Sequence, residues 1–229
     1  MRYNINIPQR KNMRFILSAI CLLFPLNTLA TPISIEFGVG NTSKYITCTR
    51  PSSKYIKRLK YEVEKFSKRY KKRTLKDSLH RVVGCGKLQR GSFSWYRGTY
   101  VKDNKTIYVE LEGGTNDTEY VLHHEFSSLL LEYYGKAVYA ELKENWTQWS
   151  NRAYNLNHGK IDWITKPKLQ KDGFLYEYCL FSFENDFNTM ATWYMTNYLR
   201  SNLESARKKH RRINEKFKLL REFYRPLLS

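Results

Sequence analysis

Two adjacent histidines followed by a glutamate are the residues of this chain best suited to carry chemistry. His123, His124 and Glu125 lie in an apolar stretch whose hydrophobic residues recur at helical spacing, so that Leu122, Phe126, Leu129 and Tyr133 share one face. His124 and Glu125 fall in a polar stripe roughly opposite that face. Because a polar stripe on an apolar helix must meet a cleft, a ligand or compensating partners, this helix is a candidate functional site.

The chemistry that this pattern indicates is zinc-assisted hydrolysis. On a zinc-peptidase helix, two histidines one turn apart bind the metal, and the glutamate between them activates water. Here the residue four after His124 is Ser128. A serine hydroxyl is a poor zinc ligand beside imidazole or carboxylate. The alternative is a histidine pair that makes hydrogen bonds inside a core.

The elements that must position these residues alternate between helices and short strands. Apolar residues at three- and four-residue steps predict a helix over 52–76. Strands are expected within 80–112, with residues 94–101 and 106–111 forming a hairpin around a polar turn. Further along the chain, a capping pair at Asn116 and Glu119 predicts that the histidine helix begins there and runs to Tyr134. Residues 136–170 are expected to be irregular or weakly helical. A helix is expected from Ser182 to about Leu203, followed by a basic amphipathic helix over 204–224.

A second segment, residues 173–192, adds a tyrosine and an acidic-Asp-Phe run, Glu184-Asn185-Asp186-Phe187. Together with His124-Glu125-Phe126, it resembles exported bacterial zinc-binding metallopeptidases of the gluzincin type, over about residues 106–192. The resemblance implies an α+β fold with one zincin-like domain, in which a small antiparallel sheet or hairpin packs on the active-site helix and further helices follow.

The resemblance also assigns roles, with two departures from the family pattern. It implies His124 as the first zinc ligand, Glu125 as the general base and Tyr178 as the group that steadies the oxyanion. Ser128 stands in place of the second histidine. The carboxylate ligand of the family aligns most simply with Asn185, which supplies no charge.

Helical geometry favours Glu184 over its neighbours as the acidic ligand. Glu184 falls near the edge of the apolar face of the helix that Ser182 is expected to begin, whereas Asp186 lies off to one side. The expected metal ligands are therefore His124 and Glu184, with His123 or Asp186 completing the set. The alternative for Glu184 is an acid in the first turn that complements the helix dipole.

These residues predict an exported zinc-dependent peptidase that acts on a peptide or protein. The alternative is a catalytically inactive relative that binds an anionic component of the cell envelope. If no third strong ligand exists, the affinity for Zn²⁺ falls steeply, and the protein is then the inactive relative.

The first thirty residues predict export to the periplasm or the medium. Basic residues, a short apolar run from Phe15 to Leu26, and small residues at Thr28 and Ala30 are typical of a signal peptide. The remaining residues, 31–229, are expected to form a single domain.

In an oxidising compartment Cys48 and Cys85, both in loop-like sequence, are expected to pair. Cys179 lies in an apolar stretch and is expected to be buried. The alternative is three reduced thiols.

The charge balance points to anionic partners. The chain carries 40 Lys and Arg against 21 Asp and Glu, a formal net charge of +19. Such a surface attracts anionic envelope polymers or lipid headgroups, although a solvated face is the ordinary explanation. No recognised nucleic-acid-binding motif is present, so a nucleic-acid partner is not expected.

Overall fold

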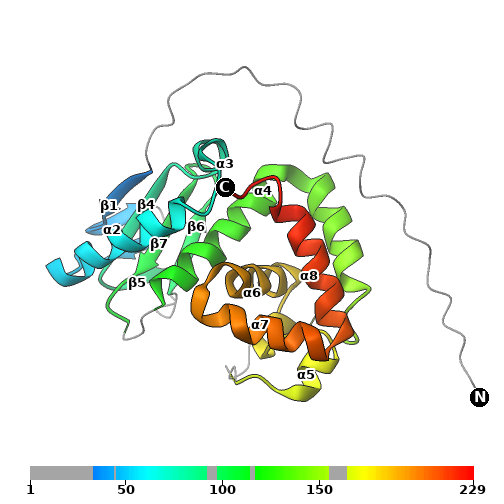
Figure 1. Ribbon diagram of the computed structural model, residues 1–229. Coiled ribbons are helices and arrows are strands. Elements are labelled where there is room, and N and C mark those ends of the chain that lie inside the picture. Colours follow the sequence, from blue (N-terminus) through cyan, green and yellow to red (C-terminus); the bar gives the residue numbers. More distant parts are fainter. Residues whose placement is uncertain (1–32, 44, 92–96, 114–116, 155–163) are drawn as a thin grey trace, which may run out of the picture. The chain divides into compact units, whose positions relative to one another are not determined.

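The computed structural model describes residues 33–43, 45–91, 97–113, 117–154 and 164–229 (Figure 1). The predicted signal peptide over residues 1–30 lies outside this part of the chain, and so does Asn116. The described residues belong to one compact unit, Thr31–Ser229. They form an α+β domain, as the sequence predicts. Among them, no helix is both long enough and apolar enough to cross a bilayer.

The larger sheet is mixed rather than antiparallel. Its strand order is β1-β4-β7-β6, and its strands are β1 (Ser34–Phe37), β4 (Arg81–Cys85), β7 (Thr106–Glu110) and β6 (Gly98–Val101). β1, β4 and β7 run parallel, and β6 alone runs antiparallel, paired with β7. The predicted hairpin is therefore confirmed as β6–β7, whereas parallel pairing comes from strands that are distant in sequence.

A smaller antiparallel sheet covers one side of the larger one. It consists of β2 (Gly40–Ser43), β3 (Ile46–Cys48) and β5 (Leu88–Arg90). Because successive residues of a strand point to opposite faces, β4 sends Val83 and Cys85 towards the small sheet and Val82 towards the helices. Cys85 forms a disulfide with Cys48 of β3, as predicted, and Cys179 is buried and free.

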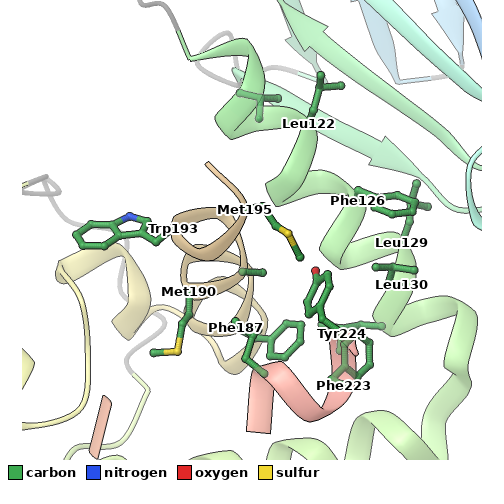
Figure 2. Packing of buried hydrophobic residues seen from close by; sticks show 14 of the residues in the cluster. Leu122, Phe126, Leu129, Leu130, Phe187, Met190, Trp193, Met195, Phe223 and Tyr224 are labelled. Carbon is green, nitrogen blue, oxygen red and sulfur yellow. The ribbon is translucent and has the colours of Figure 1, made fainter. Parts of the chain in front are cut away.

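Helices cover the other side and build most of the core. They are α2 (Ser53–Ser67), α3 (Lys72–Ser78), α4 (Thr118–Thr147), α5 (Pro167–Lys171), the 3-10 helix η2 (Glu177–Leu180), α6 (Phe183–Met195), α7 (Asn197–Lys209) and α8 (Arg211–Tyr224). The long helix α4 packs against β6 and β7 on one side and against α6 on the other. Figure 2 shows the meeting of α4, α6 and α8, where the ring of Phe187 lies beside that of Tyr224, with centroids 6.2 Å apart.

The helix predicted over 52–76 is two helices. α2 ends at Ser67, and α3 begins at Lys72. Between them, Tyr70 pairs with Leu228 as an isolated bridge, and the Lys71 N–H donates to the Leu227 carbonyl at 2.9 Å. The backbone leaves the helix here to bond with the end of the chain, a contact that local spacing does not reveal.

Residues 136–147, predicted to be irregular or weakly helical, belong to the long helix α4. Gly135, expected to end the histidine helix, adopts φ 82° and ψ 174°, which breaks the helical dihedrals. The helix then resumes to Thr147 and buries Leu142 and Trp146. Residues 155–163 of this prediction lie outside the described part of the chain.

The last predicted helices are correct in type but not in their bounds. Ser182 caps α6 as expected, because its hydroxyl accepts a hydrogen bond from the Asn185 N–H at 3.0 Å. α6 ends at Met195 rather than near residue 203, since Thr196 turns to extended dihedrals. A similar break at His210 divides the expected basic helix between α7 and α8.

Candidate functional site

The helix α4 brings the His-Glu pair against the antiparallel edge strand β6. Gly98 of β6 makes this approach possible, because a Cβ atom there would lie 2.2 Å from Val121 Cγ1 and 3.3 Å from Glu125 Oε1. A glycine inside a strand commonly marks such close packing. Glu125, half-buried, thus lies directly against β6.

His124 is held between two tyrosines. Its ring stacks on that of Tyr120 with centroids 5.8 Å apart, and it lies 5.7 Å from the ring of Tyr178. Burial lowers the pKa of His124 to about 4, so the imidazole is neutral at physiological pH. Its Nδ1 is enclosed and has no hydrogen-bond partner within the described ranges. A neutral, enclosed imidazole is able to act as a hydrogen-bonding or ligating group.

Glu125 and Glu184 lie close enough to influence each other. Burial raises the pKa of Glu125 to about 8, with the Glu184 charge as a further cause and Arg90 opposing both. Tyr100 of β6 donates a hydrogen bond to Glu184 Oε1 at 3.4 Å. Burial raises the pKa of Tyr178, and the charges of Glu125 and Glu184 contribute to this rise. Glu125, Glu184 and Tyr178 therefore share one electrostatic environment.

Ser128 does not face an open coordination position. Its Oγ accepts a hydrogen bond from Asn188 Nδ2 at 2.7 Å, and both side chains are buried. This bond joins α4 to α6 one helical turn after His124. The position of the second histidine in a zinc-peptidase helix is thus occupied by a neutral hydroxyl–amide pair.

His123, predicted as a supplementary metal ligand, faces the hydrophobic core. Its Nδ1 shares a hydrogen bond with the Tyr70 hydroxyl at 2.9 Å, and its ring packs against Phe66. Burial lowers its pKa to about 3. Since Nδ1 is occupied and Nε2 is buried with no hydrogen-bond partner in the described part of the chain, His123 has the surroundings of a structural residue.

Asp186, the reserve ligand, is engaged in a buried ion pair. Its Oδ2 lies 2.7 Å from Lys216 Nζ and also accepts hydrogen bonds from Trp146 Nε1 at 2.8 Å and from the Tyr154 hydroxyl at 3.1 Å. Both charged side chains are fully enclosed. The Lys216 ammonium group therefore balances the charge of the Asp186 carboxylate.

The residues present do not fit a zinc site with three protein ligands. Among the described residues, no group of three or more His, Cys, Asp and Glu side chains comes together in a way that could hold a metal ion. His124 and Glu184 retain suitable chemistry, but Ser128 and Asn185 supply neither imidazole nor charge. The predicted zinc centre is therefore not supported by the arrangement of these side chains.

Several residues of this region were not predicted from the sequence. Tyr120 lies one helical turn before His124, and helical spacing alone places the two side by side. Gly98 inside an expected strand was a signal for close approach. Tyr100 and Asn188 act across elements that are distant in sequence, so no local pattern identifies them.

Comparison with known proteins gives one structural likeness. No protein-family model matches the sequence, and no curated protein matches it. A crystal structure of a "putative zinc-binding metallo-peptidase" from Bacteroides caccae aligns with 85% of this chain and 79% of its own, at 14% identity and a TM-score of 0.47. The metal-binding description belongs to that protein.

Proposed function

We propose that this chain is an exported metallopeptidase-like protein that binds an extended peptide or protein segment and has lost metal-dependent cleavage. The hydrogen bond between Ser128 and Asn188 carries this proposal. It fills the position where a peptidase helix needs its second imidazole, and it engages the Ser128 hydroxyl and the Asn188 amide nitrogen in a buried setting. A neutral amide–hydroxyl pair offers no anionic or imidazole ligand to a metal.

The edge strand β6 supports an extended peptide as the ligand. Within the described ranges β6 pairs with β7 on one side only. An edge strand presents backbone N–H and C=O groups that an added peptide strand can use. Since Gly98 packs on Glu125 and Tyr100 bonds to Glu184, a peptide along β6 would run past the predicted site residues.

The disulfide supports export. Bonds such as Cys48–Cys85 persist in oxidising compartments and are uncommon in the reducing cytosol. Together with the signal-like first thirty residues, this favours the periplasm or the medium.

A zinc-dependent peptidase is the second candidate. It is favoured by His124, Glu125 and Tyr178, which the fold keeps together although the further ligands are replaced. The two candidates differ in one measurable property, since the peptidase must bind a metal ion and the binding protein need not.

Zinc content and casein turnover distinguish these candidates. Purified protein of residues 31–229 is incubated with zinc, desalted and analysed for metal, and its binding and cleavage of unfolded casein are measured. We expect casein binding, zinc far below one ion per chain, and no cleavage. A stoichiometric zinc ion that is lost in His124→Ala but kept in His80→Ala, with casein cleavage, would establish the peptidase instead. Failure to bind casein would refute the peptide-binding role.

A further inference from the structure

The helix α2 presents a basic ridge to solvent. At 100° per residue, Lys54, Lys57, Tyr61 and Lys68 fall on one side of the helix, opposite the buried Leu59. All four ridge residues are exposed, and Tyr61 is 60% exposed. The ridge therefore places one aromatic ring among three lysines, of which Lys68 pairs with the exposed Glu64 beside it.

The positive charge of this region is largely uncompensated. Residues 53–76 contain eleven Lys and Arg and two Asp and Glu, a difference of +9. Five exposed lysines make no ion pair with any described residue; they are Lys54, Lys57, Lys60, Lys71 and Lys72. Lysines left without partners at this density attract a negatively charged surface.

The residue types indicate which kind of anionic partner fits. Lysine ammonium groups are strongly hydrated point charges that respond to a diffuse negative potential, whereas bidentate recognition of single phosphates favours arginine. Clusters of four to eight basic residues on an amphipathic helix are typical of binding to anionic lipids. Tyrosine is enriched at the membrane–water interface, where its ring meets the acyl boundary and its hydroxyl meets water.

We propose that the ridge of α2, continued by Lys71 and Lys72, is a docking surface for an anionic lipid bilayer. The protein binds peripherally, with the lysines in the headgroup layer and Tyr61 at the interface. The buried side of α2 stays packed on α4 and β4, so docking requires no unfolding. This inference is independent of the proposed peptide binding, because it uses none of the residues of that site.

Vesicle co-sedimentation tests the proposal. Protein of residues 31–229 is mixed with vesicles of phosphatidylcholine alone or with about one-third phosphatidylglycerol, at low and high salt. We expect binding to the anionic vesicles only, weakened by salt. The triple variant Lys54→Gln/Lys57→Gln/Lys68→Gln is expected to lower the partition coefficient about a hundredfold, since each lysine near such a surface contributes about a fivefold change.

A matched variant controls for net charge. Lys143→Gln/Lys208→Gln/Lys209→Gln removes the same three charges from exposed positions on α4 and α7, and we expect a much smaller loss of binding. Circular dichroism confirms that both variants fold. Equal losses in the two variants, or no binding of the unmodified protein to anionic vesicles, would overturn the proposal.

Tyr61→Ser separates a bilayer from a soluble polyanion. Tyr61 contributes apolar area only at a lipid interface, so we expect the change to weaken vesicle binding severalfold. It is expected to leave any attraction to soluble polyphosphate unaltered. Tight binding of polyphosphate without vesicle binding would contradict a membrane surface and indicate a soluble anionic polymer.

Discussion

Neighbouring residues of identical type have different surroundings in this protein. His123 bonds to Tyr70 and packs in the core, whereas His124 lies between the rings of Tyr120 and Tyr178. The 100° step of the helix produces this separation. We therefore expect His123 to affect stability, and His124 is the histidine that we assign to the proposed site.

At the residue scale we predict that His123 makes folding sensitive to acid. Its folded pKa of about 3 lies below the value of about 6.5 expected for the unfolded chain. As the pH falls, the unfolded chain therefore takes up the proton first, and stability is lost. Between about pH 7.5 and 5.5, this group removes about 1.4 kcal/mol from the free energy of unfolding.

Urea denaturation of the His123→Gln variant at both pH values measures this contribution. The fall in stability is expected to be about 1.4 kcal/mol smaller in the variant than in the unmodified protein. His80→Gln, at an exposed position, serves as the control and is expected to retain the full fall. An equal fall in the free energy of unfolding in the unmodified protein and in His123→Gln would contradict the prediction.

At the scale of elements, single residues divide long helical stretches. Gly135 bends α4, Thr196 separates α6 from α7, and His210 separates α7 from α8. The bend in α4 lies between the part that carries His124 and the part that carries Trp146. Each part can therefore pack on different neighbours: the first on β6 and the second on Asp186 of α6.

We predict that Gly135→Ala destabilises the protein through its backbone. The dihedrals of Gly135, φ 82° and ψ 174°, belong to a region that is almost exclusive to glycine. Apart from its chain neighbours and the backbone of α4, no atom lies within 4 Å of the added Cβ, so a clash with other elements makes no contribution. The expected loss is about 1–3 kcal/mol in the free energy of unfolding. Thermal denaturation measures it, with Lys136→Ala as a nearly neutral neighbour; equal stability of both variants would refute the backbone argument.

At the scale of the whole molecule, two interactions join distant segments of the chain. Lys216 of α8 reaches Asp186 of α6 and the Gly173 carbonyl, beside the ring of Phe174. The disulfide joins Cys48 to Cys85 across 37 residues. Both hold together segments that lie far apart along the chain.

We predict that Lys216→Met costs about 3–5 kcal/mol of stability, because Asp186 would remain charged and buried without its partner. The double variant Lys216→Met/Asp186→Asn is expected to recover part of this loss, since the amide can still accept from Trp146 and Tyr154. Urea denaturation compares both with Lys218→Met, which breaks only an exposed pair with Glu215 and is expected to cost less than about 1 kcal/mol. No recovery in the double variant would contradict the charge argument.

Reduction of the disulfide is expected to lower stability by about 4 kcal/mol in the chain-entropy model. Urea denaturation with and without reductant provides the measurement. Thiol titration of non-reduced protein of residues 31–229 is expected to detect no reactive thiol when folded and one after unfolding, because Cys179 is buried. Three reactive thiols in the unfolded, non-reduced chain would contradict the Cys48–Cys85 bond.

The sequence by itself determined the local features of this protein. Helical periodicity placed His124 and Glu125 on one helix, the polar turn predicted the β6–β7 hairpin, and Ser182 identified the start of α6. The pairing of Cys48 with Cys85 was also predicted, although the two residues lie in the strands β3 and β4 rather than in the expected loops. These features depend on residues close in sequence or on composition.

Only the tertiary structure decided what surrounds these elements. The parallel pairing of β1, β4 and β7, the bridge from Tyr70 to Leu228, and the bond from Asn188 to Ser128 join residues far apart along the chain. Chain periodicity reports which face of an element is apolar, but not which other element covers it. For this reason the candidate ligands and the serine at position 128 could be named from the sequence, whereas the hydrogen bond from Asn188 to Ser128 is decided only by the packing of α4 against α6.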